Sequence, residues 1–273
     1  MGSPGSAARV LLLESRLQSV LADLVRQAGW EPLCAPAVRE VEADPEEVRG
    51  PLERLCRGDV GLVVLQTGVG AARLEQLAHR LGLGEAFLQA VRTVPLALRG
   101  PKPASVAGRW GVRAAFAARS PYTTRELCLA LDPAELAGRA VFVQHHGEPN
   151  GALASYLLGR GALPVDALPY RWALPEDPGP LRDAVGQVVR GEVDAVLVTS
   201  RAQVLHVFQV AAAMGMVDAF RRALNHTVVG AVGPVARRAL EDQGVRVAVE
   251  PPQPKMVPLV QSLRSHLDAR RSR

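Results

Sequence analysis

The sequence has few of the residues that cross-link small secreted proteins or bind structural metals. Its three cysteines, Cys34, Cys56 and Cys128, lie far apart and form no CxxC pair, so neither a disulfide framework nor a zinc site is expected. No apolar run approaches the roughly 20 residues that a membrane-spanning helix needs. Residues 1–9 (MGSPGSAAR) lack the charged and apolar regions of a signal peptide. We therefore expect a cytoplasmic protein that has no membrane partner.

Lysine is also scarce. Lys102 and Lys255 are the only two, so arginine makes up the rest of the 32 basic residues. The net charge of +5 invites a nucleic-acid-binding hypothesis, but the basic residues are spread along the chain and cluster only at residues 270–273. We expect no nucleic-acid partner, because dispersed arginines better suit contacts with an anionic small molecule.

Common catalytic motifs are missing as well. The chain has no GxxxxGK[ST] loop, no HExxH motif and no GxSxG motif. Residues 68–73 (GVGAAR) resemble the GxGxxG dinucleotide fingerprint, but Arg73 stands where the third glycine belongs. A nicotinamide-dependent dehydrogenase is therefore the weakest alternative. His145 and His146 end a predicted strand without metal-ligand spacing, so no metal site is expected.

The sequence does contain an internal repeat with an offset of 133 residues. This offset relates Gly58 to Gly191, Gly100-Pro101 to Gly233-Pro234, and Gly111 to Gly244. Solenoid repeats are about 20–50 residues long, so a period of this length indicates two copies of a whole lobe.

Each copy reads as strands alternating with helices, which predicts an α/β fold of two doubly wound parallel-sheet lobes. In the second copy we expect strands over 193–199 and 226–232, helices over 201–214 and 234–243, and a short strand from Val245. Two proline-punctuated stretches, 32–41 and 164–178, suit connectors or edge strands. Polar residues at strand ends then predict a ligand-binding cleft between the lobes.

The predicted site residues follow strands or open helices. Thr199, Ser200 and Arg201 end an apolar strand at the position where open α/β sheets bind ligands. A Gly-Pro pair at a strand-to-helix turn leaves helix N–H groups pointing outward, which suits an anion. A tight turn with no ligand explains any single such pair equally well.

Taken together, these motifs resemble the uroporphyrinogen-III synthase family over roughly residues 9–265. The resemblance rests on residues 193–200 (VDAVLVTS), 232–234 (VGP), 144–147 (QHHG) and 168–172 (LPYRW), with 67–70 (TGVG) and 99–103 (RGPKP) as in some bacterial members.

The resemblance implies two lobes joined by a two-stranded linker. Lobe 1 would comprise residues 1–36 and 172–273, so that the first strand and helix pack into the C-terminal lobe. Lobe 2 would comprise 40–168, with linkers near 37–39 and 169–171. The chain would act as a monomer.

The resemblance also implies an activity: cofactor-free closure of hydroxymethylbilane, a polycarboxylate tetrapyrrole, to uroporphyrinogen III. Tyr170 matches the family's favoured proton donor, and a packing role for this residue is the equal alternative. The implied substrate-binding residues are Thr67, Gly68, Arg99, Gly100, Gln144, His145, Thr199, Ser200, Arg201, Gly233 and Pro234.

Three positions depart from the family pattern. Pro103 in the first copy, and Val235 and Ala236 in the second, stand where threonines are frequent. A catalytically weak or inactive, regulatory tetrapyrrole-binding homologue with two lobes therefore stays open as the alternative.

Overall fold

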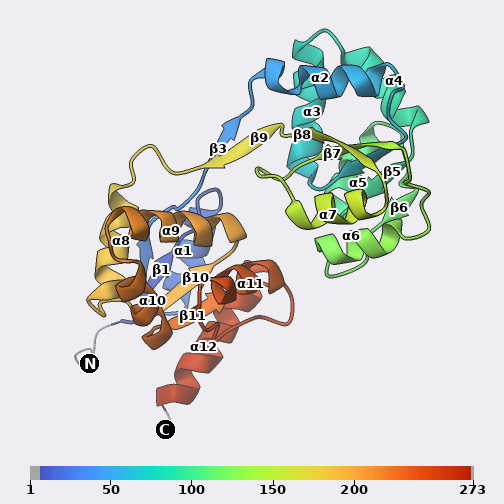
Figure 1. Cartoon of the computed structure of the whole chain (residues 1–273). Coiled ribbons are helices and arrows are strands. Elements are labelled where there is room, and N and C mark those ends of the chain that lie inside the picture. Colours follow the sequence, from blue (N-terminus) through green and yellow to red (C-terminus); the bar gives the residue numbers. More distant parts are fainter. Residues whose placement is uncertain (1–6, 272–273) are drawn as a thin grey trace. The chain divides into compact units, whose positions relative to one another are not determined.

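The computed structural model describes residues 7–271. The chain forms two compact units (Figure 1). One unit comprises the chain up to Arg39 and the chain from Ala173 onward, and the other comprises Glu40–Trp172. The two crossings therefore fall inside β3 (Arg39–Glu42) and β9 (Tyr170–Ala173), which together form a two-stranded sheet.

The first unit is built on a parallel sheet of order β11-β10-β1-β2. Its elements are β1 (Arg9–Leu12), α1 (Gln18–Gln27), β2 (Glu31–Cys34), α8 (Gly179–Val189), β10 (Ala195–Val198), α9 (Arg201–Ala213), α10 (Val217–His226), β11 (Val228–Ala231), α11 (Pro234–Asp242) and α12 (Met256–Arg271). Successive β1 residues enter different cores: Leu11 packs with α8 and α9, and Val10 packs with α1 and α12. Both faces of the sheet are thus covered, as in a doubly wound fold.

The second unit repeats this plan with a parallel sheet of order β6-β5-β4-β7-β8. Its elements are α2 (Pro45–Cys56), β4 (Leu62–Leu65), α3 (Gly68–Arg80), α4 (Gly84–Thr93), β5 (Leu96–Leu98), α5 (Pro101–Arg109), β6 (Phe116–Ala117), α6 (Thr124–Leu131), β7 (Ala140–Gln144), α7 (Gly151–Gly159) and β8 (Leu163–Ala167). Val63 of β4 packs against helices α2–α5, and its neighbour Val64 packs with α6 and α7.

The structure confirms the two-copy α/β fold. Strand β10 begins 133 residues after β4, and the same offset relates α9 to α3, α10 to α4, and α11 to α5. In the sheets, β5-β4-β7-β8 corresponds to β11-β10-β1-β2. The first strand of the chain therefore takes the place in one unit that β7 takes in the other, as the family resemblance implies.

The two proline-punctuated stretches contain edge strands as well as connectors. Pro32 lies in β2 and Pro164 in β8, each at the edge of its sheet. Proline has no N–H to donate, so it is tolerated where the strand's outer side faces no partner.

Some predicted boundaries were wrong. A strand was predicted over 226–232, but the observed β11 is shorter and begins at Val228. Helix α10 occupies the segment up to His226 and buries Phe220 and Leu224. The predicted strand from Val245 is reduced to a single bridge between Gly230 and Val249. Helix α12, which covers the Val10 side of the first sheet, was not predicted at all.

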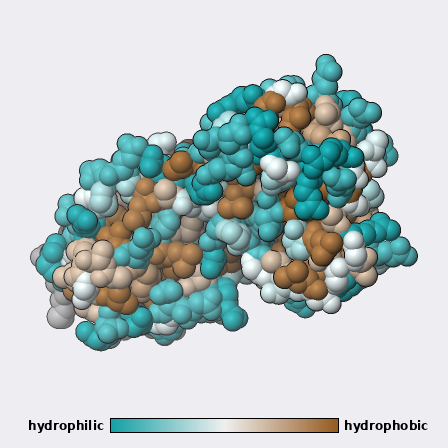
Figure 2. Space-filling model, turned by 45° about the horizontal axis from the view of Figure 1, so that its top comes forward, coloured by the Kyte–Doolittle hydropathy of each residue, from teal (hydrophilic) through white to brown (hydrophobic). Residues whose placement is uncertain are grey.

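Hydrophobic side chains that remain exposed are scattered. Leu129, Leu158 and Leu163 are examples, and on the face shown in Figure 2 hydrophilic residues separate the hydrophobic patches. Isolated exposed apolar residues are normal in folded proteins. Within residues 7–271, no helix has the length and apolar character that crossing a membrane requires.

Candidate functional site

In the unit built on β4, polar side chains meet at the carboxyl edge of the sheet. Gln66 and Thr67 follow β4, Arg99 follows β5, and Gln144 and His145 end β7. Because β5, β4 and β7 are adjacent and parallel, their ends lie side by side. Ligands of open α/β sheets bind at this edge.

Thr67 links the sheet edge to the predicted proton donor. It caps α3, its Oγ1 accepting a hydrogen bond from Gly70 N at 3.0 Å, and Gln144 Nε2 donates to the same oxygen at 3.4 Å. The Tyr170 hydroxyl oxygen lies 3.3 Å from Thr67 Oγ1. A hydroxyl has two acceptor lone pairs and one proton, so Thr67 directs its own proton at the Tyr170 oxygen.

Tyr170 is also tightly packed. Its side chain is 1% exposed, and its ring makes edge contacts with Trp172 and His146 at centroid distances of 5.2 and 6.1 Å. The Arg73 guanidinium lies 5.8 Å from the ring centroid and forms an ion pair with Glu40. The tyrosine that the family resemblance implies as proton donor is thus buried and surrounded by other side chains, and its role stays a prediction.

The glycines of the GVGAAR segment are explained by packing. A Cβ on Gly70 would lie 1.9 Å from Gln144 Nε2, and one on Gly68 would lie 2.8 Å from the Lys102 carbonyl oxygen. Arg73, in place of the third fingerprint glycine, pairs with Glu40. The glycines therefore allow α3 to approach Gln144 and α5 closely, with no need for a dinucleotide.

Gln144 is fully buried, and its amide satisfies the backbone at the end of β4. Gln144 Oε1 accepts hydrogen bonds from Gln66 N and Thr67 N, each at 3.0 Å, and Gln144 Nε2 also donates to the His145 carbonyl oxygen. All these contacts of Gln144 are with the protein itself, so Gln144 holds the site residues in place and does not present its amide to a ligand.

His145 lies at the centre of a second hydrogen-bond network. Its Nε2 is 2.6 Å from Asp166 Oδ1, and Asn150 N donates to its Nδ1 at 3.2 Å. This arrangement assigns the proton to Nε2, because Nδ1 must accept. Gln66 Nε2 lies 3.3 Å from the same Nδ1, and Gln66 Oε1 accepts from Asn150 Nδ2 at 2.7 Å.

The other unit has a polar strand end of the same design with different residues. Ser200 caps α9, its Oγ accepting from Gln203 N at 3.3 Å, as Thr67 caps α3. Gln203 Oε1 accepts a hydrogen bond from Thr199 N at 2.8 Å, just as Gln144 Oε1 accepts one from Thr67 N at the end of β4. Glu14, at the end of β1, accepts hydrogen bonds from Thr199 Oγ1 and from Gln203 Nε2. Because Glu14 is acidic, this strand end is less suited to an anion than its counterpart at Thr67.

The two Gly-Pro turns differ in the donors they offer. Gly100-Pro101 opens α5 and Gly233-Pro234 opens α11. The first turn of α5 contains both Pro101 and Pro103, and neither residue has a backbone N–H. The side chain of Pro103 is also buried. The first turn of α11 keeps the N–H groups of Val235 and Ala236. Anion binding at a helix N-terminus uses these N–H groups, so α11 is the better anion site. Arg201, the first residue of α9, is exposed.

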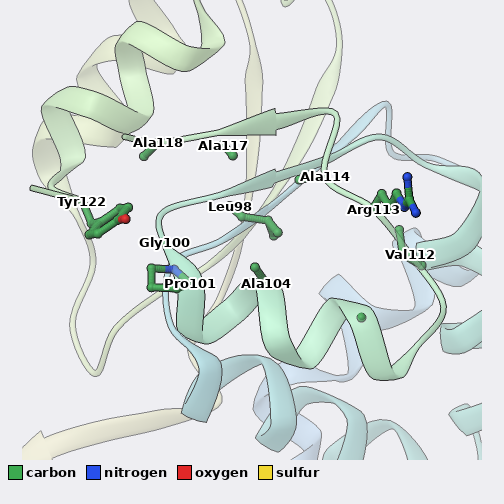
Figure 3. Close-up of a pocket in the computed structure, with 11 residues that line it drawn as sticks. Leu98, Gly100, Pro101, Ala104, Val112, Arg113, Ala114, Ala117, Ala118 and Tyr122 are labelled. Atoms are coloured by element: carbon green, nitrogen blue, oxygen red, sulfur yellow. The ribbon is translucent and has the colours of Figure 1, made fainter. Parts of the chain in front are cut away.

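An open hollow of about 420 Å³ lies beside the Gly100-Pro101 turn. It runs between α5 and strands β5 and β6, from Tyr122 at one end to Arg113 at the other (Figure 3). On α5 the lining residues include Ala104 and Gly108. The corresponding positions of α11 carry Arg237 and Glu241, an ion pair of 2.8 Å.

The structure therefore brings together Thr67, Arg99, Gln144, His145 and Tyr170 in one unit. In the other unit it brings together Thr199 and Ser200. Among residues 7–271 no group of His, Cys, Asp or Glu side chains could hold a metal ion. The expected cleft between the lobes stays a prediction.

Several residues of these networks were not predicted: Gln66, Asn150, Asp166, Glu14 and Gln203. Gln66 directly precedes the predicted Thr67, and Asn150 precedes a helix as a capping residue does. Glu14 and Asp166 carry no local signal, because sheet pairing alone brings them to their partners.

Comparison with known proteins gives one consistent result. The family model described as uroporphyrinogen-III synthase HemD matches residues 19–261. A putative uroporphyrinogen-III synthase of Methanothermobacter thermautotrophicus is 31% identical over 230 residues, 84% of this chain and 86% of that protein. A Bacillus subtilis protein called uncharacterized protein YjjA is 29% identical over 98% of this chain and 99% of its own length.

Solved structures agree. A mutant uroporphyrinogen III synthase from the extremely thermophilic bacterium Thermus thermophilus is similar with a TM-score of 0.79 and 26% identity, covering 96% of this chain and 100% of that chain. The wild-type Thermus enzyme in another crystal form is similar with a TM-score of 0.62 and 28% identity, covering 97% of this chain and 99% of that chain.

Proposed function

Since the chain belongs to the uroporphyrinogen-III synthase family, we propose that it closes hydroxymethylbilane to uroporphyrinogen III. The hydroxyl leaves as water, ring D is inverted and the macrocycle is completed, without a cofactor. The observation that carries the proposal is the pairing of the Thr67 and Tyr170 hydroxyls, 3.3 Å apart, at the carboxyl edge of a parallel sheet.

The substrate is intrinsically reactive, so the protein has little chemistry to supply. Departure of the hydroxyl leaves a cation conjugated with the pyrrole, and in solution the chain closes to the type I isomer without inversion. A synthase must therefore speed the departure and hold ring D in the geometry that leads to inversion. Positioning and electrostatic stabilisation can do both.

We assign the proton transfer to Tyr170. Its phenol gives a proton to the leaving hydroxyl oxygen, the carbon–oxygen bond breaks and water departs. When the ring closes, the proton lost from the pyrrole returns to the phenolate, so the net loss is one water. Thr67 aims its proton at the Tyr170 oxygen, which directs the Tyr170 proton elsewhere. Because the side chain is 1% exposed, substrate binding must first uncover the hydroxyl.

The carboxylates of the substrate suit the helix N-termini of both units. The first turns of α3 and α11 present backbone N–H groups next to Gly68 and Gly233, where the helix dipole also favours an anion. Arg201 adds an exposed cation at the start of α9. These groups fix the carboxylates, and thereby the rings, without entering the reaction.

A second function is favoured by two observations. Pro103, Val235 and Ala236 remove the hydroxyls that the family often has after the Gly-Pro turns, and the Tyr170 hydroxyl is covered. A protein that binds tetrapyrroles without converting them would tolerate both. It would have the same anion contacts and no need for a proton donor.

A coupled assay separates the two functions. Porphobilinogen and porphobilinogen deaminase generate hydroxymethylbilane in place, and the oxidised products are separated as type I and type III isomers. The synthase proposal predicts that added protein makes type III the major product. Type I alone, formed at the rate seen without the protein, would leave the binding function.

A further inference from the structure

Two arginines interact with Tyr170, and their charges are balanced differently. Arg73 forms an ion pair with Glu40 and lies 3.9 Å from Glu42, so its charge is neutralised within the protein. Arg99 interacts electrostatically with Tyr170, which favours the charged form of Arg99 and so acts to raise its pKa. The hydrogen bond from its Nη1 to Gln66 Oε1, at 3.5 Å, goes to a neutral acceptor.

No Asp or Glu side chain within residues 7–271 pairs with Arg99. Surrounding protein atoms desolvate the guanidinium and lower its pKa. A desolvated cation without a counter-ion costs free energy, and such charges in proteins are normally paired. Arg99 is partly buried and carries a charge that no acidic side chain of the described chain offsets, so an anion from outside would be a favourable partner for it.

The neutral neighbour of Arg99 is held in place on several sides. Gln66 is 3% exposed, its amide nitrogen faces His145 Nδ1 at 3.3 Å, and its oxygen accepts from Asn150 Nδ2 at 2.7 Å. The amide cannot flip, because its nitrogen would then face the Asn150 donor. The network thus keeps an uncharged oxygen toward Arg99 and leaves its positive charge uncancelled.

We propose that Arg99 binds one carboxylate of the ligand at the carboxyl edge of the β4–β5–β7 sheet, and that Gln66 positions its guanidinium. The inference deepens the proposed function and rests on it for the identity of the ligand. A guanidinium can hold a carboxylate through two parallel hydrogen bonds.

The test uses uroporphyrin I, a stable and fluorescent tetrapyrrole with eight carboxylates, as the binding probe. Arg99→Met is compared with Arg109→Gln, which removes one positive charge from an exposed position at the end of α5. We expect Arg99→Met to weaken uroporphyrin I binding by about 10- to 100-fold, as loss of a charged hydrogen bond does. We expect Arg109→Gln to change it less than about twofold. Equal effects of the two variants would overturn the proposal.

The Tm of the ligand-free protein is a second measurement, and it distinguishes a ligand-binding arginine from one that stabilises the fold. Arg99→Met removes an unpaired charge and fills the same space, so we expect the Tm of the ligand-free protein to rise. A fall in Tm would show that Arg99 supports the fold and would contradict the inference.

Gln66→Glu tests the role of the neutral neighbour. The new carboxylate would lie where Gln66 Oε1 is now, 3.5 Å from Arg99 Nη1. It would form an ion pair with the Arg99 guanidinium inside the protein. We expect uroporphyrin I binding to weaken although Arg99 is present, with circular dichroism confirming that the variant folds. Unchanged affinity in the folded variant would count against the proposal.

The outcomes also separate this inference from the proposed function. A wild type that binds uroporphyrin I through Arg99 but forms no type III isomer would retain the inference and lose the synthase. If the wild type forms the type III isomer while Arg99→Met binds uroporphyrin I normally, the synthase function is retained and the inference about Arg99 is lost.

Discussion

Gln144 occupies the space that a side chain at position 70 would need, since a Cβ on Gly70 would lie 1.9 Å from Gln144 Nε2 and 2.4 Å from its Cδ. In the other unit the corresponding position is Gln203, whose own amide accepts from the end of β10. At each strand end one glutamine amide thus accepts hydrogen bonds from the backbone, and it comes from β7 in one unit and from α9 in the other.

This relationship predicts the cost of Gly70→Ala. The methyl group would displace the buried Gln144 amide and leave Gln66 N and Thr67 N without their acceptor. An unsatisfied buried donor costs about 1–3 kcal/mol, so we expect unfolding free energy to fall by at least about 2 kcal/mol. Urea unfolding followed by tryptophan fluorescence measures it, since Trp110 and Trp172 lie in this unit.

Gly50→Ala is the matched control for Gly70→Ala. Gly50 lies within α2, and a Cβ there would meet nothing within 4 Å. Alanine in an open helical position should stabilise by about 0.5–1 kcal/mol. If both variants shift stability in the same direction, the contact with Gln144 does not decide the residue at position 70.

Tyr170→Phe tests the proton donor. A positioned acid contributes about 10²–10⁴-fold, and a phenol with an ordinary pKa near 10 is a weak acid, so we expect type III formation to slow by about 10- to 100-fold. The ring contacts with Trp172 and His146 remain, so the fold and uroporphyrin I affinity should change little.

Tyr156→Phe is the control for this variant. Tyr156 donates to Asp132 on the α7 side of the sheet, and neither residue belongs to the predicted site. Its loss should leave the isomer ratio and rate unchanged. A wild-type rate in Tyr170→Phe would assign Tyr170 to packing alone.

Ligand binding should depend on salt. Contacts between an octacarboxylate and exposed groups such as Arg201 are screened over about 10 Å at 0.1 M and about 3 Å at 1 M ionic strength. We expect the Kd of uroporphyrin I to rise steadily between these conditions, and to rise less steeply in Arg201→Gln. Affinity that is indifferent to salt would remove the electrostatic basis of the proposed contacts.

The cap of α6 should make stability depend on pH. Thr123 and Glu126 form a capping box, and the Thr123 hydroxyl holds the pKa of Glu126 below its ordinary value of 4.5. A carboxylate whose pKa is lowered by folding contributes its full stability above the ordinary value. It loses this contribution as the pH falls through the lowered, folded-state value.

Glu126→Gln checks this sign. At pH 7 we expect the variant to be about 0.3–1 kcal/mol less stable, the usual range for an exposed charge at a helix N-terminus. The difference should shrink as the pH falls below 4.5 and vanish once the folded wild type is protonated. Urea unfolding from about pH 3 to pH 7 measures it, and a gap that stays constant with pH would contradict the assignment.

Local features were largely predictable from sequence. The capping box of α6 has a local sequence signature, because it depends on Thr123 and Glu126, three positions apart. The buried strand before Thr199 and the Gly-Pro turns were predicted for the same reason. Helix α10 was not predicted, although Val217, Phe220 and Leu224 have helical spacing.

The sequence by itself determined the duplication, the α/β class and the polar strand ends, since repeats, periodicity and caps are properties of short or regularly spaced segments. Only the tertiary structure decided which residues meet. Glu14 reaches Thr199, 185 residues away, because β1 inserts between β10 and β2. The separation of Arg99 from any acidic partner in the described chain likewise depends on the order β5-β4-β7 and on the amide of Gln66 between Arg99 and His145. Strand order is set by the packing of the whole unit, so no local pattern encodes these contacts.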